Sequence, residues 1–499
     1  MTSATGGVAP PERDALDHPS AGSRAIRGSA LRGMGYAVGT LLTLASAPLL
    51  VRHLGLVESG RYFTVVALVA LVGGVSDAGL AVIAVREYAV RTGPERDRFM
   101  REILGARLGL TVAGVLAATT FAALAGYGGA LILGTVLAGL GLVLATLTHT
   151  YAIPLFANLR VGWQTAIDVL AKALGAGLVI AFVLASAGTV VFLAVPILPG
   201  VVSLVLIVAL TRGEVPLRPS TDWRELGRLL RETLPIAVAT VLATLYARVV
   251  ILVMSIIATK VATGQFGTAS RVGEVAVGVP VALVGTTFPI FARAASTDPA
   301  RFAYVLRRVG EVALIGGAWM TLVTLLGAGV IADVLVPARD GPAGVAEVLR
   351  IISVALLLVF LNVTWQTGLV ALGRLRDLAV VNGTALAALV VLTFVLVPSL
   401  AARGAAIAAV GGEAVLMTGS VVALWRARPD LRLELGLLPR VAAAFAGAVA
   451  VATILPGAGA VDVIAATVAY FGILATLGGI PGELRQALAR REPGRVLGS

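Results

Sequence analysis

The 499-residue sequence contains no cysteine and only three histidines. The lack of cysteine excludes a disulfide framework, a thiolate metal site and a cysteine nucleophile. The histidines, His18, His53 and His149, lie far apart in sequence and have no metal-ligand spacing. The sequence also has no Walker motif and no Ser–His–Asp candidate. We therefore expect no catalytic residue, no bound metal and no cofactor, and hence no enzyme.

Charged residues are also scarce, because they make up 13% of the chain, against 58% for hydrophobic residues. A soluble globular chain is nearer one quarter charged and one half apolar. The apolar excess has no aqueous core to fill, whereas about 20 consecutive apolar residues span the hydrocarbon core of a bilayer. The composition therefore indicates an all-α, polytopic membrane protein.

Apolar windows separated by turns and charges predict fourteen membrane spans. The first six are Gly33–Val51, Tyr62–Val85, Leu104–Leu124, Gly128–Thr148, Thr165–Leu184 and Thr189–Leu210. The next six are Thr233–Ala258, Phe266–Phe291, Val309–Val330, Val348–Leu372, Leu378–Val397 and Gly404–Trp425. Two further spans, Val441–Leu455 and Val461–Ile480, close the series.

This series divides the chain into two six-helix lobes, over 33–210 and 233–425, followed by a pair of helices within 426–480. A charged segment, 211–232, links the lobes. The segment 1–32 is rich in proline, glycine, serine and charge, and we expect a disordered tail there and a second tail over 481–499. A cleaved signal ending near Ala45–Ala47 is the alternative for the N-terminus, but the apolar run continues to Val51.

Lysine and arginine alternate between the loops of the two sides. Of the 39 basic residues, 30 fall in one set of loops together with both termini, and five fall in the opposite set. Basic loops remain in the cytoplasm during insertion. We therefore expect a multi-pass protein of the cytoplasmic membrane with both termini cytoplasmic. The net charge of +12 follows from this topology, so nucleic acid is not an expected partner.

A short segment recurs between the two lobes. Gly60-Arg61-Tyr62 aligns with Gly264-Gln265-Phe266, and each triplet opens the second helix of its six-helix block. Chance similarity between two apolar helices is the alternative to an internal duplication. Two related bundles with the substrate between them are a known transporter design, and we expect that design here.

Several short motifs resemble one family. They are "PLLVRHLG" at the end of the first span, Ser59-Gly60-Arg61-Tyr62, Asp77-Ala78-Gly79-Leu80, and "TGQFGTASRVGE" over Thr263–Glu274. With the helix count and block order, they resemble the polysaccharide and oligosaccharide flippase branch of the multidrug/oligosaccharidyl-lipid/polysaccharide exporter superfamily. The resemblance implies a flippase that moves undecaprenyl-linked glycans across the membrane by alternating access. A lipid-linked glycan, membrane lipids and a polysaccharide polymerase are the partners that it implies.

Ionisable residues inside spans are candidates for function, since each costs about 2.5–3.5 kcal/mol at the centre of the bilayer. Arg248 has no acid three or four residues away in the seventh span, whereas Arg271 and Glu274 are three apart in the eighth. Arginine presents a fork of donors that matches phosphate oxygens. We therefore expect Arg248 and Arg271 to face a cavity between the lobes and hold the pyrophosphate, with Glu274 tuning Arg271.

Other polar residues have two interpretations each. Lys172 either pairs with Asp168, four residues earlier, or binds substrate. Asp77 lies near the cytoplasmic end of its span and either pairs with the arginines that follow Arg86 or gates the lobes. Asn362 and Gln366, with a neighbouring tryptophan, either contact sugar or make hydrogen bonds between helices at the membrane interface.

Four alternatives to this function remain open. Lipid II flippases of the superfamily usually carry charges in the first span, but here no ionisable residue precedes Arg52. Multidrug exporters commonly use a buried acid, for which Asp168 and Glu413 are the candidates. A membrane glycosyltransferase or ligase usually has acidic residues on a long outer loop, and the first outer loop here contains only Glu58. A scaffold for a polymerase complex would leave no clear signature.

Overall fold

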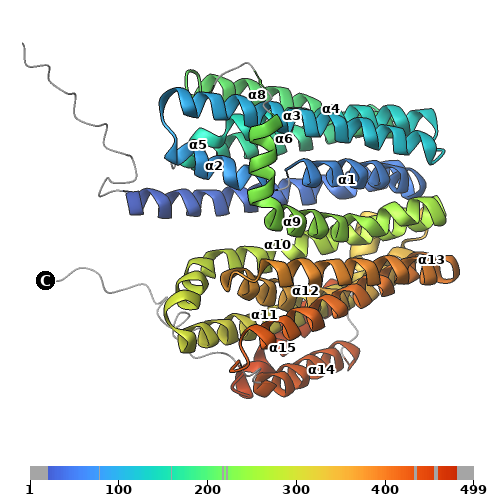
Figure 1. The fold of residues 1–499 in the computed structure, drawn as a ribbon. Coiled ribbons are helices and arrows are strands. Elements are labelled where there is room, and N and C mark those ends of the chain that lie inside the picture. Colours follow the sequence, from blue (N-terminus) through green and yellow to red (C-terminus); the bar gives the residue numbers. More distant parts are fainter. Residues whose placement is uncertain are drawn as a thin grey trace, which may run out of the picture.

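The computed structural model describes residues 21–77, 79–158, 160–215, 219–220, 223–431, 435–454 and 459–479. All regular elements in these ranges are helices, and most of them run side by side along one direction (Figure 1). Nine helices in the described ranges are long and apolar enough to cross a membrane by length and composition, and two shorter apolar helices follow them. The all-α, polytopic fold class is confirmed.

The first half of the chain forms one group of helices, drawn at the top of Figure 1. Its members are α1 (Ala21–Asp77), α2 (Leu80–Val90), α3 (Gly93–Leu124), α4 (Gly129–Tyr151), α5 (Ile153–Ala157), α6 (Val161–Leu184), α7 (Thr189–Leu193) and α8 (Ile197–Leu210). Within this group α1 packs against α3, α4 and α6, and α4 packs against α3 and α8. We refer to this group, α1 to α8, as the N-half.

The second half forms the lower group, which we refer to as the C-half (Figure 1). Its members are α9 (Trp223–Ile257), α10 (Lys260–Thr297), α11 (Pro299–Leu335), η1 (Ala338–Asp340), α12 (Pro342–Ala371), α13 (Leu375–Ala427), η2 (Leu435–Leu437), α14 (Leu438–Ile454) and α15 (Ala460–Thr476). α12 lies between α10, α11 and α13, whereas α14 and α15 pack against each other and on α11.

Two of the long helices each contain two of the expected spans, joined at one non-helical residue. α1 turns at Gly55 (φ 75°, ψ 172°) and α13 turns at Ala401 (φ 50°, ψ −126°). The left-handed φ is free of cost for glycine but strained for alanine. Gly404 permits the second turn, because a Cβ there would lie 2.3 Å from the carbonyl oxygen of Leu396. The connections expected at these points are therefore shorter than the sequence indicates.

Some expected boundaries differ from the structure. Residues 21–32, expected in a disordered tail, belong to α1, and residues 223–232, expected in the linker, belong to α9. The second span was expected to continue to Val85, but α1 ends at Asp77 and α2 begins at Leu80 after Gly79, whose φ is 77°. Residues 1–20 and the expected tail 481–499 lie outside the described residues.

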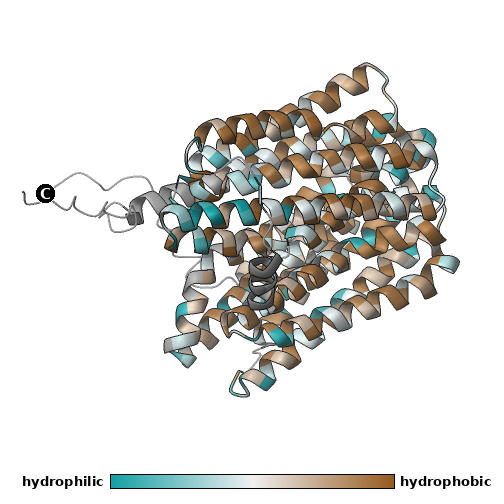
Figure 2. Cartoon of the chain, turned by 45° about the horizontal axis from the view of Figure 1, so that its top comes forward, coloured by the Kyte–Doolittle hydropathy of each residue, from teal (hydrophilic) through white to brown (hydrophobic). Residues whose placement is uncertain are grey.

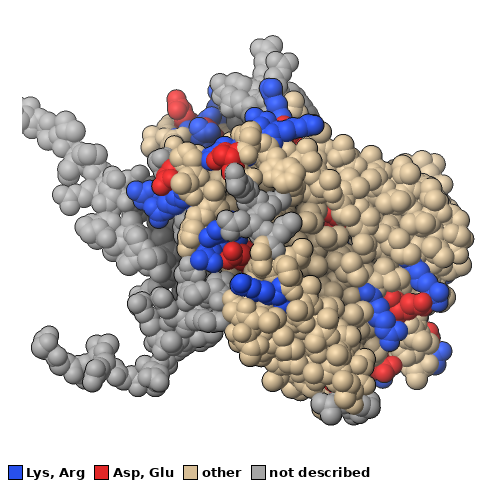
Figure 3. All heavy atoms as spheres, turned by 90° about the horizontal axis from the view of Figure 1, so that it is seen from below, with Lys and Arg blue, Asp and Glu red and all other residues tan. Residues whose placement is uncertain are grey.

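Charged side chains gather at two ends of the molecule. Figure 3 shows basic and acidic residues together in one group at each end of this face, with a broad band of other residues between the two groups. The hydropathy colouring agrees, because the middle portions of the helices are mostly apolar (Figure 2). Exposed apolar side chains such as Leu116, Leu184, Val205 and Val395 lie on several of these helices. Such a band matches the hydrocarbon core of a bilayer, so the chain is a multi-pass membrane protein.

The two halves meet through α1 and α10. A Cβ on Gly264 of α10 would lie 2.0 Å from the carbonyl oxygen of Leu56, and a Cβ on Gly60 of α1 would lie 2.3 Å from the carbonyl oxygen of Lys260. Only glycine on both helices allows this approach, as in membrane helix pairs with small residues at their contact. The contact lies at the end away from the arginine-rich loops.

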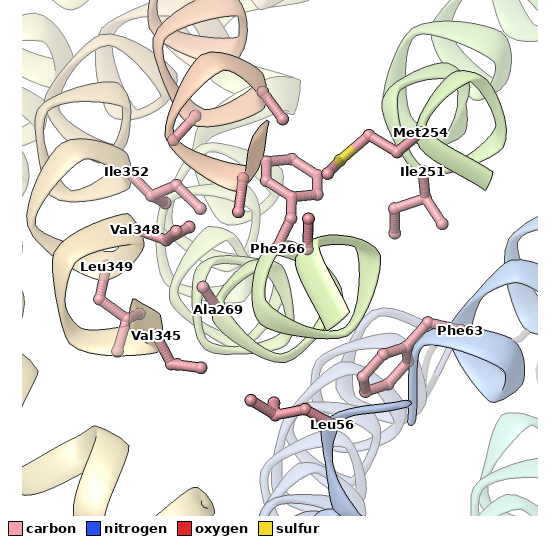
Figure 4. Packing of buried hydrophobic residues seen from close by; sticks show 14 of the residues in the cluster. Leu56, Phe63, Ile251, Met254, Phe266, Ala269, Val345, Val348, Leu349 and Ile352 are labelled. Atoms are coloured by element: carbon pink, nitrogen blue, oxygen red, sulfur yellow. The ribbon is translucent and has the colours of Figure 1, made fainter. Parts of the chain in front are cut away.

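Apolar side chains extend this contact into both halves. Leu56 and Phe63 of α1 join a buried cluster with Met254 of α9, Phe266 of α10 and Val345 of α12 (Figure 4). Arg52 adds a polar contact at the same end, because its Nη1 donates to the main-chain oxygens of Asp333 and Val334 near the end of α11. The halves are therefore closed against each other at this end.

Candidate functional site

Three of the expected site residues meet at one carboxylate. Arg248 of α9 donates from Nη1 to Oε1 of Glu274, and Arg271 donates from Nη1 to Oε2 of the same side chain at 2.8 Å. We refer to Arg248, Arg271 and Glu274 as the Arg–Glu–Arg cluster. Its side chains are 23%, 35% and 36% exposed respectively, so the cluster is neither sealed in the protein core nor fully solvated.

The cluster lies where the C-half faces α1. The guanidinium of Arg271 lies 5.4 Å from the ring centroid of Phe63, a residue of α1 in the N-half. Cation–π contact at this distance is favourable and orients the guanidinium toward the opposite half. Two guanidinium groups share one carboxylate, so the cluster has a net charge of +1. An anion with several oxygens is the ligand that this arrangement suits.

The sequence indicated only part of the cluster. The spacing of Arg271 and Glu274 on one helix predicts their ion pair. The pair between Arg248 and Glu274 joins two helices, and no local spacing reveals it. The structure thus supplies a partner for Arg248, for which the sequence offered none three or four residues away.

Asp77 is paired with one of the arginines expected for it. Nη2 of Arg107 lies 2.7 Å from Oδ1 of Asp77, with Asp77 38% and Arg107 only 5% exposed. The pair joins the end of α1 to α3. Both residues belong to the N-half, so this contact stabilises the N-half rather than joining it to the C-half.

The side chain of Lys172, a residue of α6, lies against the segment of α1 that precedes the turn at Gly55. An ideal Cβ on Gly39 would lie 2.4 Å from Cδ and 2.9 Å from Nζ of Lys172, so the absence of a side chain at Gly39 makes room for the lysine. On the same helix, Nε2 of Gln164 donates to Oδ1 of Asp168 at 2.8 Å. These contacts fall on other helices than the Arg–Glu–Arg cluster.

Asn362 is buried inside the C-half, where its side chain forms hydrogen bonds with Glu413. Its Nδ2 donates to Oε2 of Glu413 at 2.7 Å, and the hydroxyl of Tyr246 donates to Oε1 of Glu413 at 3.0 Å. Asn362 is 2% exposed, so its position suits a hydrogen bond between α12 and α13 better than contact with a sugar. Gln366, one turn later, is half-buried. Sequence analysis raised Glu413 as a candidate but did not reveal its two neutral donors.

Comparison with known proteins identifies the family and the fold. The model of a family described as polysaccharide biosynthesis protein matches residues 25–295. No curated protein sequence matches the chain. A solved structure of the lipid II flippase MurJ in an inward closed conformation superposes with a TM-score of 0.75, with 13% identity, over 92% of this chain and 100% of that chain.

Two MATE structures have a similar fold. An inward-facing multidrug resistance transporter of the MATE family, a member of the MOP superfamily, gives a TM-score of 0.60 at 15% identity, over 81% of this chain and 98% of that chain. A structure of MATE in complex with MaL6 gives a TM-score of 0.55 at 17% identity, over 82% of this chain and 96% of that chain. At such identities the likeness concerns the fold alone.

Proposed function

Since the chain belongs to the polysaccharide biosynthesis protein family, we propose that it is a flippase for a lipid-linked oligosaccharide of the undecaprenyl-pyrophosphate type. It moves this lipid from the inner to the outer leaflet of the cytoplasmic membrane, for the export of a cell-surface polysaccharide. Both termini lie in the cytoplasm, and the chain acts as a transporter rather than as an enzyme. A polysaccharide polymerase on the outer side is the partner that takes the product.

The Arg–Glu–Arg cluster is the observation that carries this proposal. A lipid pyrophosphate brings several anionic oxygens, and each guanidinium offers a planar fork of donors to them. In the resting state Glu274 occupies those donors, which lowers the cost of holding two cations in a partly buried place. The pyrophosphate then competes with this carboxylate. Binding by competition remains weak enough for the lipid to leave on the other side.

Alternating access requires two bodies that move against each other. The halves are closed at one end through Gly60 and Gly264. The cluster approaches α1 through Phe63, three residues from Gly60. A transition that opens the glycine contact therefore changes the surroundings of Arg271 at the same time. Lys172, on α6 of the N-half, provides a further cation for the lipid during passage.

Multidrug export is the second candidate, and Glu413 is the observation that favours it. This carboxylate lies inside the C-half, where two neutral groups, the hydroxyl of Tyr246 and the side-chain amide of Asn362, donate hydrogen bonds to it. A carboxylate in that position can bind a proton or a metal cation as the coupling ion of an exporter. The family match favours the lipid-linked glycan as cargo.

Reconstitution separates these functions. The full chain in proteoliposomes receives a fluorescent lipid-linked oligosaccharide, and a membrane-impermeant quencher reports how much lies in the outer leaflet. Movement of the intact lipid, without change in its mass, supports the flippase. Elongation or transfer of the glycan supports a glycosyltransferase or ligase, and transport of a cationic drug without lipid movement supports the multidrug exporter.

A further inference from the structure

A cavity of about 500 Å³ lies in the C-half, away from the Arg–Glu–Arg cluster. Its walls come from α11, α12 and α13, and the start of α14 closes one side. Trp365 of α12 and Met417 of α13 contribute to an apolar interior, and Leu438 contributes from α14. A volume of this size suits a ligand rather than a single water molecule. We refer to it as the α11–α14 cavity.

The mouth of this cavity lies at the depth of lipid headgroups. Tyr304 and Trp425, two of its lining residues, are 46% and 47% exposed. Exposed tyrosine and tryptophan in membrane proteins are concentrated at the boundary between hydrocarbon and water. Leu438, which also lines the cavity, is 44% exposed. Because exposed apolar side chains of a membrane-spanning bundle face acyl chains, the surroundings of the mouth are lipid.

Charges at the mouth favour an anionic headgroup. Arg307 lines the cavity, and its Nε lies 3.7 Å from Oε1 of Glu311. Nη1 of Arg308 lies 2.8 Å from the other oxygen of this carboxylate, Oε2. Asp430, the other acid of the lining, is already bound in bidentate fashion by Arg428. The hydrogen bonds from Arg428 lower the pKa of the Asp430 carboxyl, so this acid stays charged and neutralised by its own partner. These three arginines and two acids leave one positive charge.

We infer that the α11–α14 cavity binds one anionic phospholipid of the surrounding bilayer. An acyl chain occupies the interior beside Trp365 and Met417, and the phosphodiester lies at the mouth near Arg307. Such a lipid ties α14 to α11, α12 and α13 and stays bound during the transport cycle. This inference concerns a resident lipid and does not depend on which cargo the transporter carries.

Native mass spectrometry with the detergent-solubilised full chain tests the inference. We expect one phosphatidylglycerol to remain bound under conditions that remove phosphatidylcholine. Arg307→Gln should weaken phosphatidylglycerol binding by about tenfold, as the loss of a hydrogen bond to a charged group implies. Ala303→Phe, which places a ring inside the cavity, should weaken binding of both lipids.

Matched control variants keep the result interpretable. Arg376→Gln removes an exposed arginine at the start of α13, and Ala117→Phe adds a ring on an exposed position of α3; neither residue lines the cavity, and neither change should alter the bound lipid. Equal retention of phosphatidylglycerol and phosphatidylcholine, unaffected by Arg307→Gln and Ala303→Phe, would overturn the inference. Displacement of phosphatidylglycerol by undecaprenyl phosphate at the same site would assign the cavity to the cargo's tail and also overturn it.

Discussion

Gly60 and Gly264 contact each other's helices across the junction of the two halves. They are also the residues that align when the first half of the sequence is compared with the second. When two related units pack around a two-fold axis, residues on the axis meet their own counterparts. The contact between these two glycines therefore supports an internal duplication, and it places the axis between α1 and α10.

Replacement of Gly264 by leucine should prevent the halves from closing at this end. The added side chain would collide with the carbonyl oxygen of Leu56, which lies 2.0 Å from the position of a Cβ, and backbone atoms cannot rotate away. We expect lipid movement in proteoliposomes to fall by about tenfold or more, as a disrupted glycine contact between membrane helices implies.

Gly177→Leu is the matched control, because no atom outside its own helix lies within 4 Å of a Cβ there. It should leave transport unchanged. Full transport by Gly264→Leu would show that this contact is not used in the cycle.

The double variant Arg248→Gln/Arg271→Gln should lose affinity for the pyrophosphate. Each hydrogen bond to a charged group is worth about 1.5–3 kcal/mol, so the apparent dissociation constant should rise by at least about tenfold. Titration with a lipid pyrophosphate and, in parallel, with the uncharged lipid alcohol measures this. A change that is equal for both ligands would exclude the cluster from phosphate binding.

Glu274→Gln should have the opposite effect on binding. The neutral amide releases both guanidinium groups and raises the charge of the cluster from +1 to +2. We expect tighter binding of the lipid pyrophosphate, by about fivefold, together with slower turnover, because the lipid leaves less readily. Single-turnover and steady-state transport rates distinguish the two effects. Weaker binding by this variant would mean that Glu274 positions the arginines rather than competing with the lipid.

Asn362→Ala tests whether this side chain contacts sugar or joins helices. This substitution removes the 2.7 Å hydrogen bond that Nδ2 of Asn362 donates to the carboxylate of Glu413. We expect the free energy of unfolding to fall by about 2 kcal/mol, as measured by thermal unfolding in detergent, with little change in affinity for the lipid-linked glycan. A loss of affinity with unchanged stability would restore Asn362 as a sugar contact.

Asp77→Asn should destabilise the N-half, because it leaves the 5% exposed guanidinium of Arg107 without its ionised partner. Loss of one partner from a fully buried pair costs about 3–5 kcal/mol. Asp77 is 38% exposed, so we expect about 2 kcal/mol. Asp377→Asn, in the more exposed pair with Arg374, should cost less than about 1 kcal/mol. A double-mutant cycle with Arg107→Gln isolates the pair, and additive effects would contradict it.

The sequence was sufficient to locate the spans because each needs a long apolar run, and most of the expected spans coincide with a helix to within a few residues, whereas Tyr62–Val85 is divided between α1 and α2 and Thr189–Leu210 between α7 and α8. It was less informative about the connections. Gly55 and Ala401 each turn the chain with a single residue, and a positive φ at alanine depends on tertiary packing rather than on local preference.

The candidate site was predictable where partners lie on one helix. Arg271 and Glu274 follow from spacing, whereas Arg248 with Glu274 and Asn362 with Glu413 join separate helices. Such pairs depend on how helices rotate and tilt against one another, which hydrophobic patterns do not specify. Asp77 was expected to pair with the arginines near its helix end, and Arg107 is the one it meets.

α15 is a helix of 17 residues, bounded by Gly459 before it and by Leu477 after it. At 1.5 Å per residue it extends about 25 Å, which is shorter than the hydrocarbon core of about 30 Å. This hydrophobic mismatch is relieved when the bilayer thins beside the helix. The membrane beside α15 should therefore be locally compressed, and the transporter should work best in lipids with shorter acyl chains.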